Sequence, residues 1–333
     1  MIISRTPYRI SFFGGGTDYP EYYNEFGGKT LGVTINKYSY LQVRVLPPFF
    51  EHKYRIVYSK QENITNVNNI QHPSVRETIK YLGINYGLSI HHDGDIPARS
   101  GMGSSSAFTV GLLNSLNALE GKISSKHELT KQSIHIEQNL IKENVGSQDQ
   151  TFAAYGGFNL IKFLQNEEII VDPIILNKAR LEKFQDNIML FFSGLSRNAS
   201  EVVLEQREKT KINIPNLDKI KLLVDEAYEI LIDEKRDLRE FGELLNYTWE
   251  LKKKLSNKIS NKEIDTIYEK AIVAGAIGGK LLGAGGGGFM AFYVEKENQL
   301  KVLDALRGYL HIPFNFDFNG SKIIVYEPNY KGK

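Results

Sequence analysis

The sequence of 333 residues contains no cysteine. Disulfide bonds, thiolate zinc sites and cysteine nucleophiles are therefore excluded, and the composition fits a reducing compartment. The chain also lacks an uninterrupted apolar run of about 18 residues, the length that a membrane-spanning helix requires. Its first residues do not form a charged start followed by a long apolar stretch. We expect a cytoplasmic protein without a membrane partner.

An excess of charge of either sign is missing as well. The 41 Lys and Arg residues nearly balance the 39 Asp and Glu residues, which leaves a formal net charge of +2. Without an overall basic field, nucleic acid is not an expected partner, and any functional basic residue acts locally. The fractions of hydrophobic residues (41%) and charged residues (24%) are typical of a globular protein of one large or two ordinary domains.

Residue patterns along the chain predict a mixture of strands and helices. Runs of β-branched and aromatic residues predict strands at 10–13, 31–35, 38–45, 54–58, 157–161, 289–294 and 323–326. Apolar residues at helical spacing predict helices at 72–86, 104–120, 125–140, 217–231, 238–255 and 264–277. Residues 60–73 are polar and predict a loop. Because strands and helices do not alternate strictly, the pattern favours an α+β fold over a doubly wound parallel sheet.

The polar, irregular stretch around residues 176–187 predicts a boundary between two domains, which would comprise residues 1–183 and residues 184–333. The second domain is expected to be dominated by helices.

Three glycine-rich segments lie far apart in the sequence, and each joins apolar chain to a short run of hydrogen-bonding residues. We call them the first, second and third glycine segments; they span Pro7–Asp18, Pro97–Ala107 and Lys280–Phe289. Glycine lets backbone amides approach an anion without an intervening side chain. Together the segments predict a cleft that handles phosphate groups.

The second glycine segment ends in three serines that precede an apolar helix. A helix N-terminus presents unpaired N–H groups and a partial positive charge, which suits the phosphates of a nucleotide. Serine hydroxyls can also bind magnesium. In isolation, a turn followed by a helix that Ser104 caps is the simpler interpretation. We predict nucleotide binding by Gly101, Met102, Gly103, Ser104, Ser105 and Ser106.

Two better-known phosphate motifs do not fit the sequence. Gly28–Thr30 has Tyr23 at the position where a P-loop needs glycine. The second glycine segment has Ser106 where the dinucleotide-binding fingerprint needs glycine or alanine. Neither a P-loop NTPase nor a Rossmann enzyme is predicted.

The other two glycine segments carry weaker signals. Gly285–Gly288 follows a stretch with helical periodicity and precedes a hydrophobic strand. A flexible linker is one interpretation, but the apolar residues on both sides favour close approach to a ligand. Taken alone, Asp18 is a turn or capping residue and Arg9 a surface strand residue; their occurrence together with the other segments indicates function.

In this order, P-x-R…G-G-G-T-D, P…G-M-G-S-S-S-A and K-L-L-G-A-G-G-G-G-F resemble the three motifs of the GHMP small-molecule kinases, over almost the whole chain. The resemblance implies an α+β fold of two domains. The N-terminal domain would have mixed strands and helices (ribosomal protein S5 domain 2-like), and the C-terminal domain would be ferredoxin-like. The active site would lie in the cleft between them, with ATP and Mg²⁺ as cofactors.

More narrowly, T-P-Y-R-I-S-F-F-G-G-G-T-D-Y-P-E-Y-Y and the later G-S-Q-D-Q are similar to the D-glycero-D-manno-heptose 7-phosphate kinase branch. Galactokinases have G-E-H-T-D where this chain has Gly14–Asp18. The resemblance implies phosphorylation of the anomeric hydroxyl of a small sugar phosphate, to give a 1,7-bisphosphate for nucleotide-activated heptose in capsule or other surface glycans. A monomer or a homodimer is expected.

The same resemblance implies roles for individual residues. Asp149 would be the catalytic carboxylate, and Arg9 the catalytic cation beside it. Ser105 and Glu137 would bind magnesium, although Glu137 considered alone is a solvent-facing helix carboxylate. Substrate binding is predicted for Gly14, Gly15, Gly16, Thr17, Asp18, Arg197, Gly285, Gly286 and Gly287.

A substrate that already carries a phosphate needs a cationic site of its own. Arg197 is a candidate for this site, as are Arg99 and Lys280, because a basic side chain can bind phosphate directly. Each of the three is equally consistent with an ordinary surface charge.

Three alternatives stay open. A GHMP kinase for a fucose-like or galactose-like sugar would use an unphosphorylated acceptor. A non-catalytic sensor would bind sugar and ATP and signal through a partner. A surface with Tyr19, Tyr22 and Tyr23 would bind carbohydrate or protein without chemistry, although these residues are equally suited to a sugar site or the core.

Overall fold

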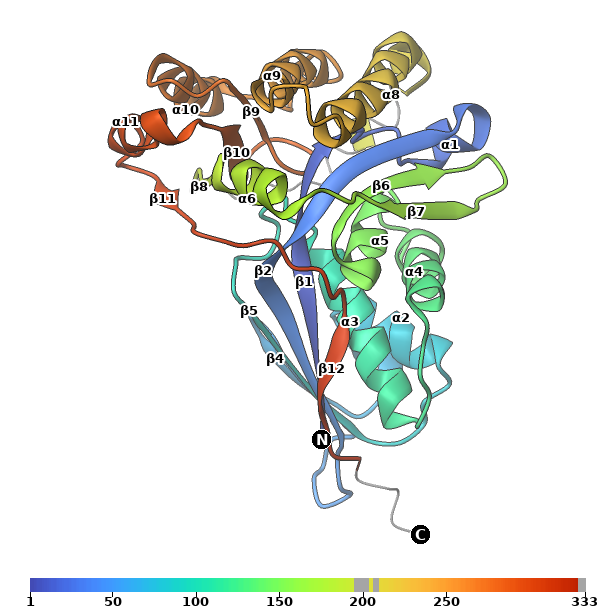
Figure 1. The fold of residues 1–333 in the computed structure, drawn as a ribbon. Helices are drawn as coiled ribbons and strands as arrows, with labels where there is room; N and C mark the ends of the chain where they lie inside the picture. The colour runs from blue at the N-terminus through green and yellow to red at the C-terminus, as the bar shows by residue number, and fades with distance from the viewer. Residues whose placement is uncertain (195–203, 206–209, 329–333) are drawn as a thin grey trace.

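The computed structural model describes residues 1–194, 204–205 and 210–328. These residues form two β-sheets with helices packed against them (Figure 1). The larger sheet carries the N-terminus, and the smaller sheet lies at the opposite end of the molecule.

The larger sheet has eight strands and is antiparallel except for one parallel pair, β3 with β5. Along the sheet the order is β12-β1-β2-β5-β3-β4, and β6 and β7 extend it from the other half of β2. The strands are β1 (Ile2–Phe13), β2 (Gly28–Val45), β3 (Tyr54–Val57), β4 (Gln61–Ile64), β5 (Leu88–Gly94), β6 (Phe158–Phe163), β7 (Ile169–Pro173) and β12 (Lys322–Tyr326).

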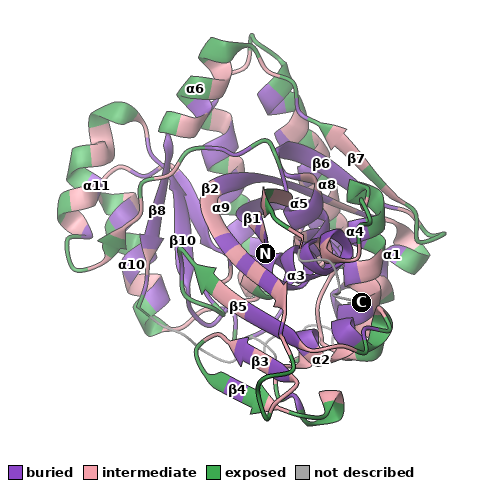
Figure 2. Cartoon of the chain, turned by 90° about the horizontal axis from the view of Figure 1, so that it is seen from below, coloured by how far each residue is buried: buried purple, intermediate pink, exposed green. Residues whose placement is uncertain are grey.

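Helices pack on the larger sheet, and α3 is the central helix of this layer. Figure 2 shows that α3 is buried along most of its length, because it packs against β1 and β2 on one side and the neighbouring helices on the other. The helical elements of this part of the chain are α1 (Pro20–Phe26), the 3₁₀ turn η1 (Val67–Asn69), α2 (Pro73–Tyr81), α3 (Ser104–Leu119), α4 (Lys126–Ile134), the π-helical turn η2 (His135–Leu140) and α5 (Gln148–Tyr155).

The smaller sheet is antiparallel with the order β11-β8-β10-β9. Its strands are β8 (Ile188–Phe192), β9 (Gly278–Leu281), β10 (Phe289–Tyr293) and β11 (Leu310–His311). The helices of this part are α6 (Lys178–Asp186), α8 (Thr210–Ile232), α9 (Arg239–Lys253), α10 (Lys262–Val273), the 3₁₀ turn η3 (Lys296–Asn298) and α11 (Gln299–Ala305).

Strand β1 connects the two parts of the molecule. Its residues from Thr6 to Phe13 are all buried, because α3 and α5 contact the strand as well as α8 and α9. Burial on both faces explains why apolar and aromatic residues do not alternate strictly with polar ones here, and why the polar residues Thr6, Arg9 and Ser11 are buried as well. The strand thereby holds Arg9 in the interior of the protein.

Most of the predicted elements are confirmed. The capping box is present: Ser125 Oγ accepts from Glu128 N at 3.1 Å, and Glu128 Oε2 accepts from Ser125 N at 2.7 Å. Two predictions were wrong. The stretch 60–73 contains β4 and η1 instead of being only a loop, and the third glycine segment starts in strand β9 instead of a helix, since Lys280 and Leu281 pair with β10.

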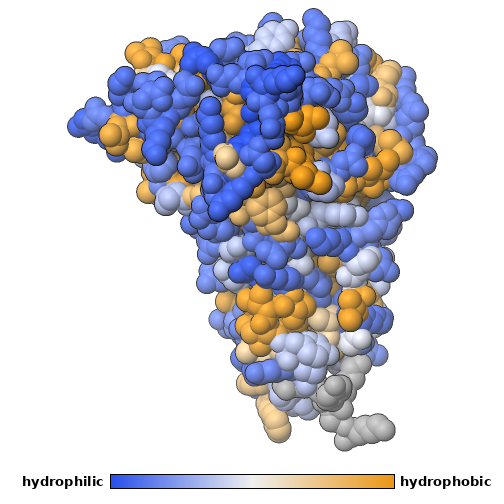
Figure 3. All heavy atoms as spheres, in the orientation of Figure 1, coloured by the Kyte–Doolittle hydropathy of each residue, from blue (hydrophilic) through white to orange (hydrophobic). Residues whose placement is uncertain are grey.

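The chain returns to its first sheet at its end. β12 pairs with β1, with Ile2 opposite Tyr326, so residues late in the sequence complete the N-terminal sheet. Residues 183 and 184, the predicted boundary, both lie inside α6; the division into 1–183 and 184–333 stays a prediction. Hydrophilic residues cover most of the face in Figure 3, between separate hydrophobic patches. Among the described residues, no helix combines the length and apolar character needed to span a bilayer.

Candidate active site

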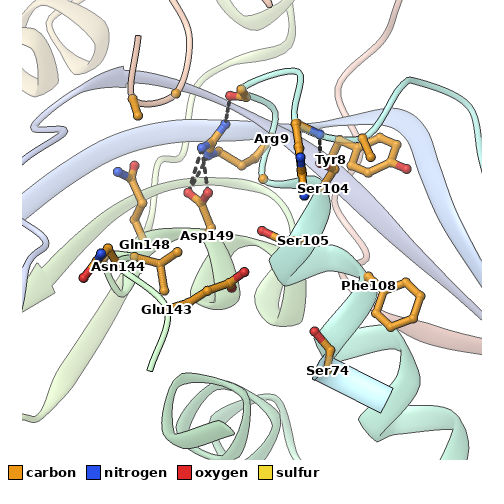
Figure 4. Close-up of a pocket in the computed structure, with 18 of the residues that line it drawn as sticks. Tyr8, Arg9, Ser74, Ser104, Ser105, Phe108, Glu143, Asn144, Gln148 and Asp149 are labelled. Carbon is orange, nitrogen blue, oxygen red and sulfur yellow. Dashed lines mark hydrogen bonds and ion pairs between the residues drawn. The ribbon is translucent and has the colours of Figure 1, made fainter. Parts of the chain in front are cut away.

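A cavity of about 1050 Å³ lies where the three glycine segments come together. Its walls come from β1, the start of α3, the start of α5, the end of α9 and the strand β9. Segments that are more than 250 residues apart in sequence thus share one cavity, because β1, a strand of the larger sheet, also contacts α8 and α9 of the other part. Figure 4 shows part of this wall.

The second glycine segment forms a loop at the N-terminus of α3. Gly101 and Gly103 have φ angles of 82° and 74°, a conformation that favours glycine. Ser104 Oγ accepts from Arg99 N at 3.1 Å, and the helix has no side-chain N-cap bond, so the interpretation of Ser104 as a helix cap was wrong. Of the predicted nucleotide-binding residues, four line the cavity and two, Met102 and Ser106, are buried.

The third glycine segment packs against the second, backbone to backbone. A Cβ on Gly101 would lie 2.5 Å from Leu282 O, and a Cβ on Gly288 would lie 2.3 Å from Ser100 O. Phe289 N also donates to Ser100 O at 3.1 Å. The close approach is therefore to the loop at residues 100–103, which we call the nucleotide loop after its predicted role.

Within the third segment, Gly283 and Ala284 line the cavity. Gly285–Gly287 do not lie on its wall. Their assignment to substrate binding stays a prediction.

Arg9 and Asp149 form a bidentate ion pair on the cavity wall (Figure 4). Arg9 Nε and Nη2 donate to the two carboxylate oxygens of Asp149, each at 2.8 Å, and Nη1 donates to Gly101 O at 2.7 Å. The Arg9 side chain is 4% exposed and that of Asp149 26% exposed. A Cβ on Gly103 would lie 3.4 Å from Asp149 Oδ2, so the carboxylate lies directly beside the nucleotide loop.

Asp18 is a second carboxylate in the cavity, and it is buried. It accepts from Gly16 N at 3.0 Å and from Gln148 N at 3.4 Å, and a Cβ on Gly146 would lie 1.9 Å from its Oδ2. Burial, and after it the charge of Asp149, raises the pKa of Asp18 to about 6. This carboxyl can thus be protonated near neutral pH and can donate as well as accept a hydrogen bond.

The rest of the first glycine segment shapes the turn that holds Asp18. Thr17 Oγ1 donates to Gly14 O and to Lys29 O, each at 2.8 Å, and a Cβ on Gly14 would lie 1.9 Å from Lys29 O. Gly15 and Gly16 line the cavity, whereas Gly14 and Thr17 do not. Arg197 lies outside the described residues.

Glu137 is buried beneath the nucleotide loop. Its Oε2 accepts from Ser106 Oγ at 2.8 Å and from Gln150 Nε2, whereas its Oε1 has no hydrogen-bond partner among the described residues. Burial raises the pKa of Glu137 to about 7. Ser105, the predicted partner of Glu137 in magnesium binding, lines the cavity.

Glu143 is a carboxylate that the sequence did not single out. It lines the cavity and points toward Ser105 (Figure 4), and its Oε2 has no hydrogen-bond partner in the part of the chain that the structure describes. Free carboxylate oxygens and a serine hydroxyl are the donors that Mg²⁺ prefers, so these residues fit the ion. No group of three or more His, Cys, Asp or Glu within the described ranges is arranged to hold a metal; an ion here would therefore need nucleotide phosphates and water as further ligands.

One end of the cavity is aromatic, which the sequence did not predict. The ring of His72 stacks on Phe108 with a centroid distance of 4.4 Å, and Tyr58 meets His72 edge-on at 4.8 Å. Burial lowers the pKa of His72 to about 4, so its ring is neutral at pH 7. This end of the cavity suits a flat, uncharged ring such as a nucleotide base.

Two buried lysines also line the cavity, and the sequence indicated only one of them. Lys280 lies in β9, and Lys252 near the end of α9. Lys252 follows Phe241, Leu245 and Trp249 on the buried stripe of that helix. A lysine at an apolar position of an amphipathic helix is a signal that could have revealed it.

Comparison with protein families gives two matches along the chain. The model of the GHMP kinases N-terminal domain matches residues 70–157, and the model of the GHMP kinases C-terminal domain matches residues 223–312. The chain belongs to the GHMP kinase family. The predicted family, the two-domain α+β fold and the enzyme class, a phosphotransferase with an alcohol group as acceptor, are confirmed.

Similar proteins include several sugar kinases. The D-glycero-alpha-D-manno-heptose 7-phosphate kinase of Campylobacter jejuni is 28% identical over 340 residues, which covers 96% of this chain and 98% of that protein. The L-fucokinase/L-fucose-1-P guanylyltransferase of Bacteroides fragilis is 26% identical over 91% of this chain and 35% of its own length. A solved D-glycero-D-manno-heptose 1-phosphate kinase from Bacteroides thetaiotaomicron has a TM-score of 0.80 and 25% identity, covering 98% of this chain and 100% of that one.

Proposed function

We propose that this GHMP kinase transfers the γ-phosphoryl group of ATP to the anomeric hydroxyl of D-glycero-D-manno-heptose 7-phosphate, and that the 1,7-bisphosphate serves nucleotide-activated heptose in capsule or other surface glycans. One observation carries the proposal: the paired Arg9 and Asp149 stand beside the nucleotide loop, in a cavity shared by all three glycine segments. The similarity to a heptose 7-phosphate kinase over 96% of the chain supports the choice of sugar.

Asp149 and Arg9 would act on the attacking hydroxyl. In the general-base form, Asp149 accepts the hydroxyl proton while the sugar oxygen bonds to the γ-phosphorus and the bond from that phosphorus to the ADP oxygen breaks. In the electrostatic form, Arg9 stabilises the negative charge as it develops on the sugar oxygen. In both forms Arg9 holds the carboxylate of Asp149 in place, because both carboxylate oxygens accept from its guanidinium.

The nucleotide would lie along the wall formed by the start of α3. The N–H groups of the loop would bind its phosphates, and the aromatic end with His72 and Phe108 would hold its base. Magnesium would be held by Ser105 and Glu137, with Glu143 as a further oxygen donor, and would neutralise charge on the phosphates.

A substrate panel tests this proposal. Heptose 7-phosphate, heptose 1-phosphate, heptose, L-fucose and galactose are each incubated with ATP and Mg²⁺, ADP release is measured, and phosphorus NMR locates the new phosphate. We expect turnover with heptose 7-phosphate and a new anomeric phosphate.

The other outcomes of the panel identify the alternatives. Preference for L-fucose or galactose would favour an unphosphorylated acceptor, which the similarity to a fucokinase makes the second candidate. A new phosphate on a hydroxyl other than the anomeric one would refute the proposed regiochemistry. Binding of sugar and ATP without ADP release would point to a sensor.

A further inference from the structure

We propose that Lys252 and Lys280 form an anion subsite of the cavity that takes a phosphate group, in the first place the phosphate that the acceptor sugar already carries. This inference rests on the proposed function for the identity of the acceptor. It rests on the structure alone for the chemistry of the group that is bound.

Both lysines are buried, and neither forms a salt bridge with the acidic residues that the structure describes. Lys252 is 6% exposed and donates to Leu281 O at 3.1 Å and to Gly283 O at 2.5 Å. Lys280 is 3% exposed and donates to Phe12 O at 2.7 Å. An ammonium group has three N–H donors, so these bonds leave donors on both lysines available to a ligand in the cavity.

Around Lys252 and Lys280, basic groups outnumber acidic ones. Arg9, Lys252 and Lys280 bring three basic groups to this part of the cavity, whereas the carboxylates that face them are Asp18 and Asp149. Asp149 is bound to Arg9 by two hydrogen bonds. This leaves Asp18, whose pKa burial raises to about 6, as the remaining carboxylate beside the two lysines.

The hydrogen bonds to backbone carbonyls do not by themselves explain why two lysines are buried here. A neutral donor could bind the same carbonyls without the large desolvation cost of a buried charge. Burial lowers the pKa of Lys252 to about 7, with the charge of Arg9 as the next cause, and burial together with the charge of Lys252 lowers the pKa of Lys280 well below its usual value. A phosphate bound between them would supply the missing negative charge and favour the protonated form of both.

The position of the pair favours the acceptor over the nucleotide. Lys280 donates to Phe12 O, in the first glycine segment, and the pair interacts with the charge of Asp18 in the same segment. Lys252 donates to Gly283 O, next to the nucleotide loop. The subsite thus lies between the first glycine segment and the nucleotide loop. A phosphate group of the nucleotide is therefore the second anion that could occupy it.

Calorimetric titration of the wild-type full chain tests the subsite without any substitution. Heptose 7-phosphate, whose phosphate is a dianion at pH 8, is titrated in two buffers that differ in ionisation enthalpy. We expect proton uptake on binding, since Lys252 is largely neutral in the free protein at this pH, and a change in the fluorescence of Trp249. Trp249 is the single tryptophan of the chain, and its ring lies 6.0 Å from Lys252 Nζ.

Variants assign the effect to the two lysines. Lys252→Met and Lys280→Met are expected to weaken heptose 7-phosphate binding by about 10- to 100-fold, the usual effect of losing a hydrogen bond to a charged group. The control is Lys253→Met, because Lys253 is the next residue on α9 but is 30% exposed and pairs with Glu250 at 2.8 Å. Unphosphorylated heptose should bind all four proteins with similar affinity.

Each result decides the proposal. Loss confined to MgADP and ATP binding keeps the anion subsite but assigns it to the nucleotide phosphate. The proposal is overturned if the lysine variants lose equal affinity for heptose and heptose 7-phosphate. It is also overturned if the wild type takes up no proton on binding and both variants keep wild-type affinity. If heptose 7-phosphate binds in a lysine-dependent way but is not phosphorylated, the proposed function is refuted and the subsite is supported. If heptose 7-phosphate is phosphorylated and both lysine variants bind it as the wild type does, the subsite is refuted and the proposed function is supported.

Discussion

Replacement of Asp149 by asparagine is the sharpest test of the site. The substitution keeps the size of the side chain and removes its charge. Arg9, whose side chain is only 4% exposed, then loses an ionised partner but retains Gly101 O at 2.7 Å, and the new amide oxygen can still accept one hydrogen bond. The variant should therefore fold.

The expected magnitudes differ for stability and catalysis. Breaking a fully buried ion pair costs about 3–5 kcal/mol, but Asp149 is 26% exposed and one bond survives, so we expect unfolding free energy to fall by about 1–2 kcal/mol. Loss of the base or of the charge that it supplies should lower kcat by about 10²-fold or more, which corresponds to about 2.7 kcal/mol of transition-state stabilisation. MgADP binding should change little, because the loop amides are unaltered.

Three measurements on one preparation separate these effects: kcat with heptose 7-phosphate, the Kd of MgADP by calorimetry, and the urea midpoint from Trp249 fluorescence. The matched control is Asp172→Asn, which removes the same charge from an exposed pair with Lys162, at 2.7 Å on β6 and β7. It should leave kcat unchanged. A folded Asp149→Asn protein whose kcat stays within about threefold of wild type would refute the assigned role.

Three further predictions follow from the same geometry. Gly101→Ala should weaken ATP binding and lower Tm, because the new Cβ meets a backbone carbonyl at 2.5 Å, whereas Gly121→Ala, with a similar positive φ but open space around it, should affect Tm only slightly; equal ATP affinities would contradict this. Glu137→Gln and Ser105→Ala should raise the Mg²⁺ concentration needed for half-maximal activity, and an unchanged dependence in both would remove them as ligands. Asp18, whose pKa rises from 3.8 to about 6 on burial, binds a proton in the folded state between these values, so its contribution to stability is present below about pH 4 and is lost as pH rises to 6. Relative to wild type, Asp18→Asn should therefore gain up to about 3 kcal/mol of stability over that range, and a difference between the urea midpoints of the two proteins that does not vary with pH would contradict the assignment.

Local patterns were sufficient for most elements of the fold. The start of α3 at the serines and the capping box of α4 follow from signals within a few residues, because helix ends depend on neighbouring side chains. The two long strands were predicted only in part: residues 10–13 of β1, and 31–35 and 38–45 as two strands where the structure has the single strand β2. The strand β9 was missed, since its four residues, Gly278–Leu281, are too few to show a period of their own and contain two glycines. Hydrogen bonds to β10 decide its conformation.

The candidate site was predicted less completely. Motif order suggested that Arg9, Asp18 and Asp149 act together, and they share one cavity. Glu143, the aromatic end at His72 and the difference between Lys252 and Lys253 depend on which side chains face the cavity. In the run Lys252–Lys254, only the place of Lys252 on the apolar stripe of α9 distinguishes it from its neighbours.

The sequence by itself determined the class of fold, the family and the glycine segments that meet at the cavity, because these features are local or lie in a fixed order along the chain. Only the tertiary structure decided the environment of each ionisable group. Burial and the charges of residues from distant segments set the pKa values of Asp18, Glu137 and Lys252, and those environments arise only when β1, α9 and the third glycine segment pack together.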